Sequence, residues 1–372
     1  MPSHKELFNG RWDYERDAEN LQLNSQQCEQ AFPGLFKEVE RSMKHRNASH
    51  ITASELDQLP KWNGYIRAMI FNQQLYVIAT EGAIYSRGLA TLHALHRAIL
   101  SSPEALPNIE FALNTDDHVP SMTIWSYARR EEDVDLWLMP DFGHWSWPET
   151  KVGTLREVQM KAESNEETWS WPFKVPTLFW RGATMGLEVR ERLLRVTAGK
   201  PWADVKAIYW REKGSMENDL KPMPDHCQYK YLAHTEGNSY SGRLKYLQSC
   251  KSVVISHKMD WIQHYHPLLT SSGTQQNFVE VQRDYSDLEE KITWLRDNDE
   301  AAEIIASNSM LLFREQYLTP AAEVCYWRKL IRGWSTVSFE PEFYSILDGQ
   351  KIWRGLPVES YLLERRLEWD PY

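Results

Sequence analysis

Residues 227–250 read CQYKYLAHTEGNSYSGRLKYLQSC, and this stretch is the most informative part of the chain. Tyrosine and leucine in the segment 229–234 suit a half-buried strand, while Gly237 and its small polar neighbours suit a turn. A helix is expected to follow from about Tyr240 to Cys250, with its leucines toward a core. The stretch therefore predicts a strand, a turn and a helix in succession.

Arg243 lies near the start of this predicted helix, where the backbone N–H groups already carry positive partial charge. A cation at that position suggests a negative ligand, such as a phosphate, bound by the helix start and the guanidinium together. A solvated helix face with a chance arginine is the alternative. The stretch matches neither the P-loop nor the dinucleotide-binding fingerprint.

Three further strand–helix pairs surround this stretch. They are Thr177–Trp180 with Leu187–Val196, Ser252–Ser256 with Asp260–Tyr265, and Asn277–Val281 with Asp287–Asp297. Repeated units of this kind predict a parallel sheet covered by helices, with ligands bound at the carboxyl ends of the strands. Helices are also expected at about 300–316 and 320–334.

The preceding half of the chain is less regular. We expect an amphipathic stretch at 26–43, a helix at 90–99, and strands at 66–71, 74–79, 109–113, 123–127 and 134–138. The Trp- and Pro-rich segment 140–176 is predicted to be irregular and to contain the hinge. The expected domains are therefore 1–175 and 176–338, followed by a tail at 339–372.

Composition restricts the ligand. The net charge is −10 and the pI is about 5.7, so a surface that coats nucleic acid is not expected. Any phosphate would be bound in a local basic pocket, which favours a small phosphorylated ligand. The 17 Trp and 17 Tyr residues suit sugar or base stacking as well as ordinary cores.

Several features concern the cellular compartment. No apolar run approaches the length of a membrane span, and no hydrophobic signal core is visible at the N-terminus. The four cysteines are compatible with disulfides in an oxidising compartment or with buried thiols, and they allow three pairings. One N-glycosylation sequon is present, Asn47-Ala48-Ser49.

Two segments outside the opening stretch are candidates for chemistry. Asp116, Asp117 and His118 follow the predicted strand 109–113 directly, and a carboxylate there could act as a general base. An Asp-rich turn is the alternative. Arg181 follows the strand 177–180, where it could bind a diphosphate or form a buried structural ion pair.

Metal-binding patterns are weak. Asp133-Val134-Asp135 and Asp297-Asn298-Asp299 both have the Asp-x-Asp form by which some nucleotide-sugar enzymes hold Mn²⁺ or Mg²⁺, but we assign both mainly to solvated surfaces. Histidines 257, 264 and 266 lack a cysteine or acidic frame with zinc spacing.

The chain resembles glycosyltransferase family 90, which includes animal protein O-glucosyltransferases and fungal capsule-associated xylosyltransferases, and it is most similar to the fungal branch. The resemblance covers about Ile109 to Trp334. It rests on motifs in a fixed order: Asn114-x-x-Asp117, Phe179-Trp180-Arg181-Gly182, His226-Cys227-x-Tyr229-Lys230-Tyr231, Gly237-x3-Ser241-x-Arg243-x-Lys245, Trp261 before Tyr265-x-Pro267, and Cys325-Tyr326-Trp327.

This resemblance implies a GT-B fold, in which two Rossmann-like domains face each other across a cleft and C-terminal helices return to the N-terminal domain. It implies inverting transfer of a sugar from a UDP-sugar to a glycan or glycoprotein hydroxyl, without a metal. Xylose or glucose is the expected sugar, and galactose is a further option. Asp117 matches the family's catalytic base, with Asp116 in reserve. His118-Val119-Pro120 departs from the animal pattern, so the acceptor stays open.

The resemblance also assigns the donor site. The matching residues are Arg181, Gly182, Gly237, Asn238, Ser239, Tyr240, Ser241, Gly242 and Arg243, of which Ser241 and Arg243 are expected on the diphosphate. Tyr240 and Gly242 differ from the animal form in size, which could change how the nucleoside or sugar packs.

The resemblance further implies the disulfides Cys227–Cys250 and Cys28–Cys325, because family members pair the corresponding cysteines. In the chain-entropy model the first bridge closes a loop in the unfolded chain and thereby stabilises the folded protein by about 3 to 4 kcal/mol. Both bridges imply an oxidising lumen, Golgi or ER, and we expect a type II membrane anchor before Met1 in the full-length form. Two alternatives are a non-catalytic sugar-binding protein that retains the fold and a metal-dependent GT-A transferase that uses Asp133 and Asp135.

Overall fold

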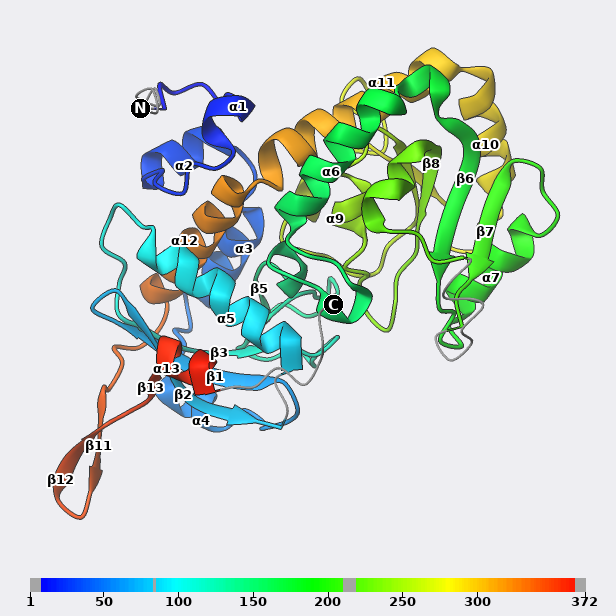
Figure 1. Cartoon of the computed structure of the whole chain (residues 1–372). Coiled ribbons are helices and arrows are strands. Elements are labelled where there is room, and N and C mark those ends of the chain that lie inside the picture. Colours follow the sequence, from blue (N-terminus) through cyan, green and yellow to red (C-terminus); the bar gives the residue numbers. More distant parts are fainter. Residues whose placement is uncertain (1–7, 83–84, 210–218, 365–372) are drawn as a thin grey trace. The chain divides into compact units, whose positions relative to one another are not determined.

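The computed structural model describes residues 8–82, 85–209 and 219–364, which form two compact units (Figure 1). Unit 1 comprises residues 1–154, 262–267 and 319–372, and unit 2 comprises residues 155–261 and 268–318. Both ends of the chain therefore belong to the same unit.

Unit 2 contains a five-stranded sheet in which every neighbouring pair is parallel. Its strands, in spatial order, are β7 (Ala203–Ala207), β6 (Val175–Gly182), β8 (Tyr229–His234), β9 (Val253–His257) and β10 (Val279–Val281). This confirms the predicted parallel sheet, and β8 has the predicted bounds. The strand order reverses between β6 and β8, and such a switch point is where α/β sheets leave room for a ligand.

Helices cover this sheet and bury a core against it. They are α6 (Leu155–Thr168), α7 (Glu188–Thr197), α10 (Leu288–Asp297) and α11 (Asp299–Leu312), with the one-turn helix α9 (Leu244–Leu247), the 3-10 turns η3 (Trp171–Phe173) and η4 (Met223–Gln228), and the π-turn η6 (Phe313–Tyr317). Leu178, Trp180, Tyr231 and Ile255 belong to the core, and none is more than 2% exposed. Burial of these apolar side chains is the main source of the unit's stability.

Two helix predictions in unit 2 were wrong in extent or kind. The helix expected at 240–250 is only the single turn α9, because serine and glycine in Ser239–Gly242 favour local turns over helix. The helix expected at 260–265 is absent from that described segment. The Glu236 carboxylate instead accepts the N–H groups of Asp260 and Trp261, at 2.9 and 2.8 Å.

Two elements of unit 2 were missed. Helix α6 lies inside the segment 140–176 that was predicted to be irregular, and its buried residues Leu155, Val158 and Ala162 have the i, i+3, i+7 spacing of a helix face. Strand β7 has no fully buried position and hence lacks the apolar pattern of its neighbours.

Unit 1 contains a six-stranded mixed sheet. Its order is β13 (Leu356–Pro357), β2 (Gln74–Glu81), β1 (Tyr65–Phe71), β3 (Ile109–Asn114), β4 (Trp125–Ser126) and β5 (Trp137–Leu138). β1 is antiparallel to β2 and β3, whereas β3, β4 and β5 are parallel. All five strands predicted in this half exist, although β4 and β5 are shorter than expected.

The longest helices of unit 1 come from distant parts of the sequence. They are α5 (Tyr85–Leu100) and α12 (Pro320–Thr336), which pack against each other, and α12 also packs on α2 (Ser25–Ala31) and α3 (Lys37–Arg46). The stretch predicted as one amphipathic segment at 26–43 is divided into α2 and α3 around Pro33-Gly34. Shorter helices of this unit are α1 (Tyr14–Asp17), α4 (Ala53–Asp57), η1 (Phe142–His144) and η2 (Pro148–Thr150), and the turn η5 (His266–Leu268) lies at the unit boundary.

The described part of the tail, residues 339–364, contains a hairpin, a short strand and a helix. Strands β11 (Tyr344–Leu347) and β12 (Gln350–Trp353) form a separate two-stranded hairpin that projects away from the six-stranded sheet (Figure 1). Helix α13 (Val358–Glu364) follows β13. Asp348 and Gly349 at the tip of the hairpin both have positive φ, 50° and 76°, as a two-residue hairpin turn requires. The Asp-Gly pair is typical of such turns, but the hairpin was not predicted.

Both expected disulfides are present. Cys28–Cys325 joins α2 to α12 within unit 1, and Cys227–Cys250 closes the opening stretch within unit 2. Across the described ranges, no helix combines the length and apolarity needed to cross a membrane.

Candidate donor and base sites

Two glycines lie at the switch point of the unit 2 sheet, where β6 and β8 end. A Cβ on Gly182 would lie 2.7 Å from the Trp180 ring and 3.1 Å from Arg243 Nη2. A Cβ on Gly237, in the loop after β8, would lie 3.2 Å from Arg190 Nη2. Because each side chain would crowd a guanidinium, glycine at these positions allows two arginines to enter the switch point.

The Arg243 side chain is partly buried, and its charge has no counter-charge in the described chain. Its guanidinium carbon lies 5.7 Å from the Trp180 ring centroid, and its buried Nε has no hydrogen-bond partner among described residues. No carboxylate of a described residue lies within ion-pairing distance of it. Burial and the nearby Arg190 lower the pKa of Arg243 to about 9, so it remains charged at neutral pH. A partly buried cation without a partner is costly, and an anionic ligand would offset that cost.

Arg190 was not predicted as a site residue. It lies in the first turn of α7 and donates to the carbonyls of Glu236 (2.8 Å) and Ala183 (2.7 Å). These bonds attach α7 to the loops after both β6 and β8. The argument used for Arg243, a cation near a helix start, would have found Arg190 as well.

Arg181 has a different environment from Arg243. Its guanidinium pairs with Asp204 on β7 at 2.7 Å and also donates to the Asp204 and Trp180 carbonyls and to the Asp219 carbonyl. It also lies over the Phe179 ring, 4.5 Å from the centroid. The structure thus shows the buried ion pair that the sequence reading had left as an alternative for this residue.

The remaining predicted donor residues form the loop between β8 and α9. Gly237 N–H donates to the Ser239 carbonyl at 2.9 Å, and Lys245 Nζ donates to the Gly242 carbonyl at 2.7 Å. Ser239 and Tyr240 are buried, Asn238 is exposed, and Ser241 and Gly242 are intermediate. The loop is therefore compact and hydrogen-bonded to itself, with Asn238 at its surface.

A buried carboxylate fixes the start of this loop. Glu236 is 1% exposed, and besides the two backbone N–H groups it accepts Arg283 Nη1 at 2.8 Å. Its own N–H donates to Nε2 of His257 (3.1 Å), so the proton of that ring is on Nδ1, which donates to the Lys258 carbonyl (2.9 Å). Burial lowers the pKa of His257 to about 4. Neither residue was predicted to belong to the site.

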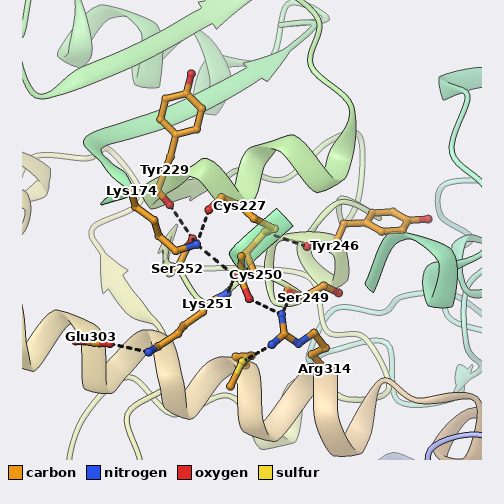
Figure 2. Close-up of polar contacts among 12 residues, drawn as sticks. Lys174, Cys227, Tyr229, Tyr246, Ser249, Cys250, Lys251, Ser252, Glu303 and Arg314 are labelled. Carbon is orange, nitrogen blue, oxygen red and sulfur yellow. Dashed lines mark hydrogen bonds and ion pairs between the residues drawn. A yellow bond between two sulfur atoms is a disulfide. The ribbon is translucent and has the colours of Figure 1, made fainter. Parts of the chain in front are cut away.

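The far end of the loop is held by a polar cluster around the disulfide (Figure 2). Lys174 Nζ donates to the Cys227 carbonyl, and Ser252 Oγ donates to the Tyr229 carbonyl at 2.7 Å. Arg314 Nη1 donates to the Ser249 carbonyl at 3.1 Å and to Glu166 at 2.6 Å. These contacts fix the backbone just after α9, and α9 directly follows Arg243.

A hollow of about 650 Å³ lies beside Gly237. Leu187 and Val189 give it apolar walls, and its charged lining is mixed, with two arginines and two carboxylates: Arg192, Arg283, Glu188 and Asp284. This combination can accept a flat ring together with hydroxyl or phosphate oxygens.

In unit 1, the two candidate carboxylates follow β3 in a tight turn. Asp116 N–H donates to Asn114 Oδ1 (2.7 Å), and Asp117 N–H donates to Asp116 Oδ1 (2.8 Å). Asp117 also pairs with Arg87 of α5 at 2.7 Å, and Arg87 lies over the Phe142 ring. The side chain of Asp117 keeps 38% exposure. Asp117 therefore lies in an Asp-rich turn and also has an accessible carboxylate held by an ion pair. The contact with Arg87 was not predicted from the sequence.

The Asp-x-Asp carboxylates have partners of their own. Asp135 pairs with His45 at 2.9 Å, Asp133 accepts the Arg130 N–H at 3.0 Å, and Asp299 pairs with Lys230 at 2.6 Å. Within the described ranges, His, Cys, Asp and Glu side chains form no group of three or more suited to a metal ion.

The fold is that of an α/β protein with two arginines, Arg190 and Arg243, at the switch point of its parallel sheet. The model of the family described as "Glycosyl transferase family 90" matches residues 24–344, so the chain belongs to this family. It is similar to protein O-glucosyltransferase 1 of Rattus norvegicus, with 26% identity over 279 residues, 67% of this chain and 69% of that protein.

Two other relatives bear related names. Protein O-glucosyltransferase 1 of Homo sapiens is 27% identical over 252 residues, 62% of this chain and 63% of the human protein. O-glucosyltransferase rumi of Drosophila melanogaster is 26% identical over 327 residues, 76% of this chain and 75% of the fly protein. At these identities the family is shared, and the protein is a glycosyltransferase by family.

Proposed function

We propose that this chain is an inverting glycosyltransferase that moves a sugar from a UDP-sugar to a hydroxyl of a glycoprotein or glycan. The observation that carries the proposal is the partly buried Arg243 at the switch point of a parallel sheet, which has no counter-charge among the described residues. Glucose or xylose is the proposed sugar, with galactose a further option, and the relatives' names favour glucose. The proposal includes the GT-B arrangement that the family resemblance implies.

The proposed chemistry is a single displacement. The acceptor oxygen attacks the anomeric carbon, the bond from that carbon to the diphosphate oxygen breaks, and the acceptor proton moves to Asp117. UDP leaves with the bonding electron pair, and the configuration inverts. Asp116 is the reserve base. Arg87 holds the Asp117 carboxylate in one orientation, which suits a group that must meet an incoming hydroxyl.

The donor site supplies positive charge where the leaving group forms. Arg243 and Arg190 would stabilise the departing diphosphate, because a guanidinium makes paired, charge-assisted hydrogen bonds to phosphate oxygens. Ser241 and the loop backbone at 237–242 would complete the contacts. The hollow beside Gly237 is the proposed nucleoside pocket. Two guanidiniums can do the work of a metal ion here, so we propose a metal-independent reaction.

The two alternative functions are less well supported. A sugar-binding protein was suggested by the many aromatic residues, yet five of the 17 tryptophans are less than 2% exposed and so unable to stack on a sugar: Trp125, Trp137, Trp180, Trp327 and Trp334. A GT-A enzyme would need Asp133 and Asp135 to share a metal, whereas their carboxylates face Arg130 and His45.

The proposed compartment follows from the disulfides. Bridges of this kind persist in an oxidising lumen, so we propose the ER or Golgi, with a type II anchor preceding this sequence.

The deciding experiment is a transfer assay. The chain is incubated with UDP-glucose, UDP-xylose or UDP-galactose and a glycoprotein acceptor, with and without EDTA, and the anomeric configuration of the product is read by NMR. We expect an inverted linkage at an unchanged rate in EDTA. A retained configuration would contradict the single displacement, and loss of activity in EDTA would revive the Asp-x-Asp sites.

A further inference from the structure

The sequon Asn47-Ala48-Ser49 lies on the surface of unit 1, immediately after α3. Helix α3 ends at Arg46, and all three sequon residues are exposed. The Asn47 side chain makes no hydrogen bond with any residue that the structure describes. Its amide nitrogen is thus accessible, and no native contact would be lost if the amide were modified.

The neighbouring side chains are fixed by contacts that leave this position open. His45 pairs with Asp135 at 2.9 Å, Arg46 pairs with Glu55, and the Ser49 N–H donates to the Arg46 carbonyl at 3.1 Å. Each of these bonds involves atoms other than the Asn47 amide. A bulky group on Asn47 would therefore extend into solvent without displacing them.

The disulfides supply a second, independent observation. Cys28–Cys325 and Cys227–Cys250 together use all four cysteines of the chain, as expected for a protein that folds in an oxidising lumen. That compartment is also where Asn-x-Ser/Thr sites receive oligosaccharide, whereas a cytosolic protein with the same sequon would stay unmodified.

We propose that Asn47 is an N-glycosylation site of this protein. The donor is an oligosaccharide linked to a lipid through a diphosphate. The bond between the anomeric carbon and the diphosphate oxygen breaks, a carbon–nitrogen bond to the Asn47 amide forms, and the amide loses one proton. The lipid diphosphate leaves with the electron pair. Asn47 takes no part in donor binding or in the proposed base, so this site is separate from the enzyme's own reaction.

The test uses the full chain secreted from a eukaryotic host. Peptide-N-glycosidase treatment in heavy-oxygen water should convert Asn47 to a labelled Asp and remove a gel shift. Asn47→Gln and Ser49→Ala should lose that shift, whereas the matched variant Ser49→Thr, which keeps a hydroxyl at the third position, should retain it. Enzyme activity of all three should equal that of the unsubstituted chain.

Disulfide mapping of the same sample makes the result decisive. Protein with both bridges formed and an unmodified Asn47 would overturn the proposal. Four free thiols would overturn it as well, because the oxidising compartment on which it depends would be wrong. A shift that persists in Asn47→Gln would place the glycan elsewhere and would also reject it.

Discussion

Arg181 and Arg243 lie in the same unit, where Arg181 is buried and Arg243 is partly buried, and their surroundings differ. Arg181 has a carboxylate, three carbonyl acceptors and an aromatic ring around it, so its charge is neutralised within the fold. Arg243 has an aromatic ring and a second arginine nearby, with no carboxylate in the described chain to match. The first arginine holds two strands together, and the second has no carboxylate partner among the described residues.

The largest predicted effect concerns a third charged residue, Asp117, which has a partner and yet stays accessible. Asp117→Asn keeps the shape of the side chain and removes the proton acceptor, so turnover should fall by about 10² to 10⁴. UDP binding, measured by calorimetry, should stay within about twofold, because Asp117 lies outside the proposed donor site.

Asp116→Asn is the matched control for that experiment. It changes the neighbouring exposed carboxylate in the same turn and should leave turnover close to normal. The reverse outcome, with Asp116→Asn inactive and Asp117→Asn active, would transfer the base to the reserve residue.

Arg243→Ala tests the ligand-binding side of the comparison. The diphosphate would lose charge-assisted hydrogen bonds worth about 1.5 to 3 kcal/mol, so UDP affinity should fall by about 10- to 100-fold. Folding stability should not decrease, because the substitution removes a partly buried charge that has no carboxylate partner among the described residues.

Arg195→Ala is the control for Arg243→Ala. Arg195 lies on the same helix as Arg190, but it is 51% exposed and pairs with Glu188 and Glu191 on the surface. Its removal should not change UDP affinity. If Arg243→Ala also binds UDP normally, Arg243 is not the donor ligand.

Arg181→Met should show the opposite behaviour. It leaves Asp204 and several carbonyl groups without their donor, and since Asp204 is 30% exposed, the expected loss of unfolding free energy is about 2 kcal/mol. UDP affinity of the folded protein should change little. Urea unfolding measures the first quantity and calorimetry measures the second.

Lys206→Met is the matched control within the same pair of strands. Lys206 makes an exposed ion pair with Asp219, which is worth about 0 to 1 kcal/mol. Equal losses of unfolding free energy in the two variants would mean that the buried ion pair of Arg181 is worth no more than the exposed pair of Lys206. A large loss of UDP affinity in Arg181→Met would mean that Arg181 belongs to the donor site.

The last prediction is a pH dependence of stability. Burial, then Arg243, lowers the pKa of His226 to about 3, and burial lowers that of His257 to about 4. The unfolded chain binds protons at these histidines from about pH 6.5 downward, whereas the folded protein does not. Stability is therefore complete above about pH 6.5 and should fall progressively as the pH is lowered from there toward pH 4.

Imidazole NMR signals test this directly. Both rings should remain neutral at pH 5, and the ring of His257 should carry its proton on Nδ1. The exposed His50 serves as the reference on the same chain. A protonated His226 at pH 5 would mean that the surroundings of Arg243 can hold a second positive charge. The absence of a counter-charge would then no longer distinguish Arg243 from Arg181.

Parts of this site could be read from the sequence because they depend on local patterns. β8 was predicted because 229–234 has strand residues before a glycine turn, and Arg243 was selected because it follows that turn. The helix after it was overestimated, and the helix at 260–265 was wrong. A distant carboxylate, Glu236, takes up the N–H groups of Asp260 and Trp261. Local propensity does not register a hydrogen bond of that kind.

The sequence by itself determined the parallel sheet, the motifs of the family and the order in which the candidate residues occur. The resemblance supplied the pairing of the cysteines, and the structure confirmed it. Which arginine has its charge paired within the fold is visible only in the three-dimensional structure. The partner of Arg181 comes from β7, and Arg190 reaches the switch point from α7. Burial and counter-charge depend on residues far apart in the chain, so the strand-end patterns that selected Arg181 and Arg243 could not separate them.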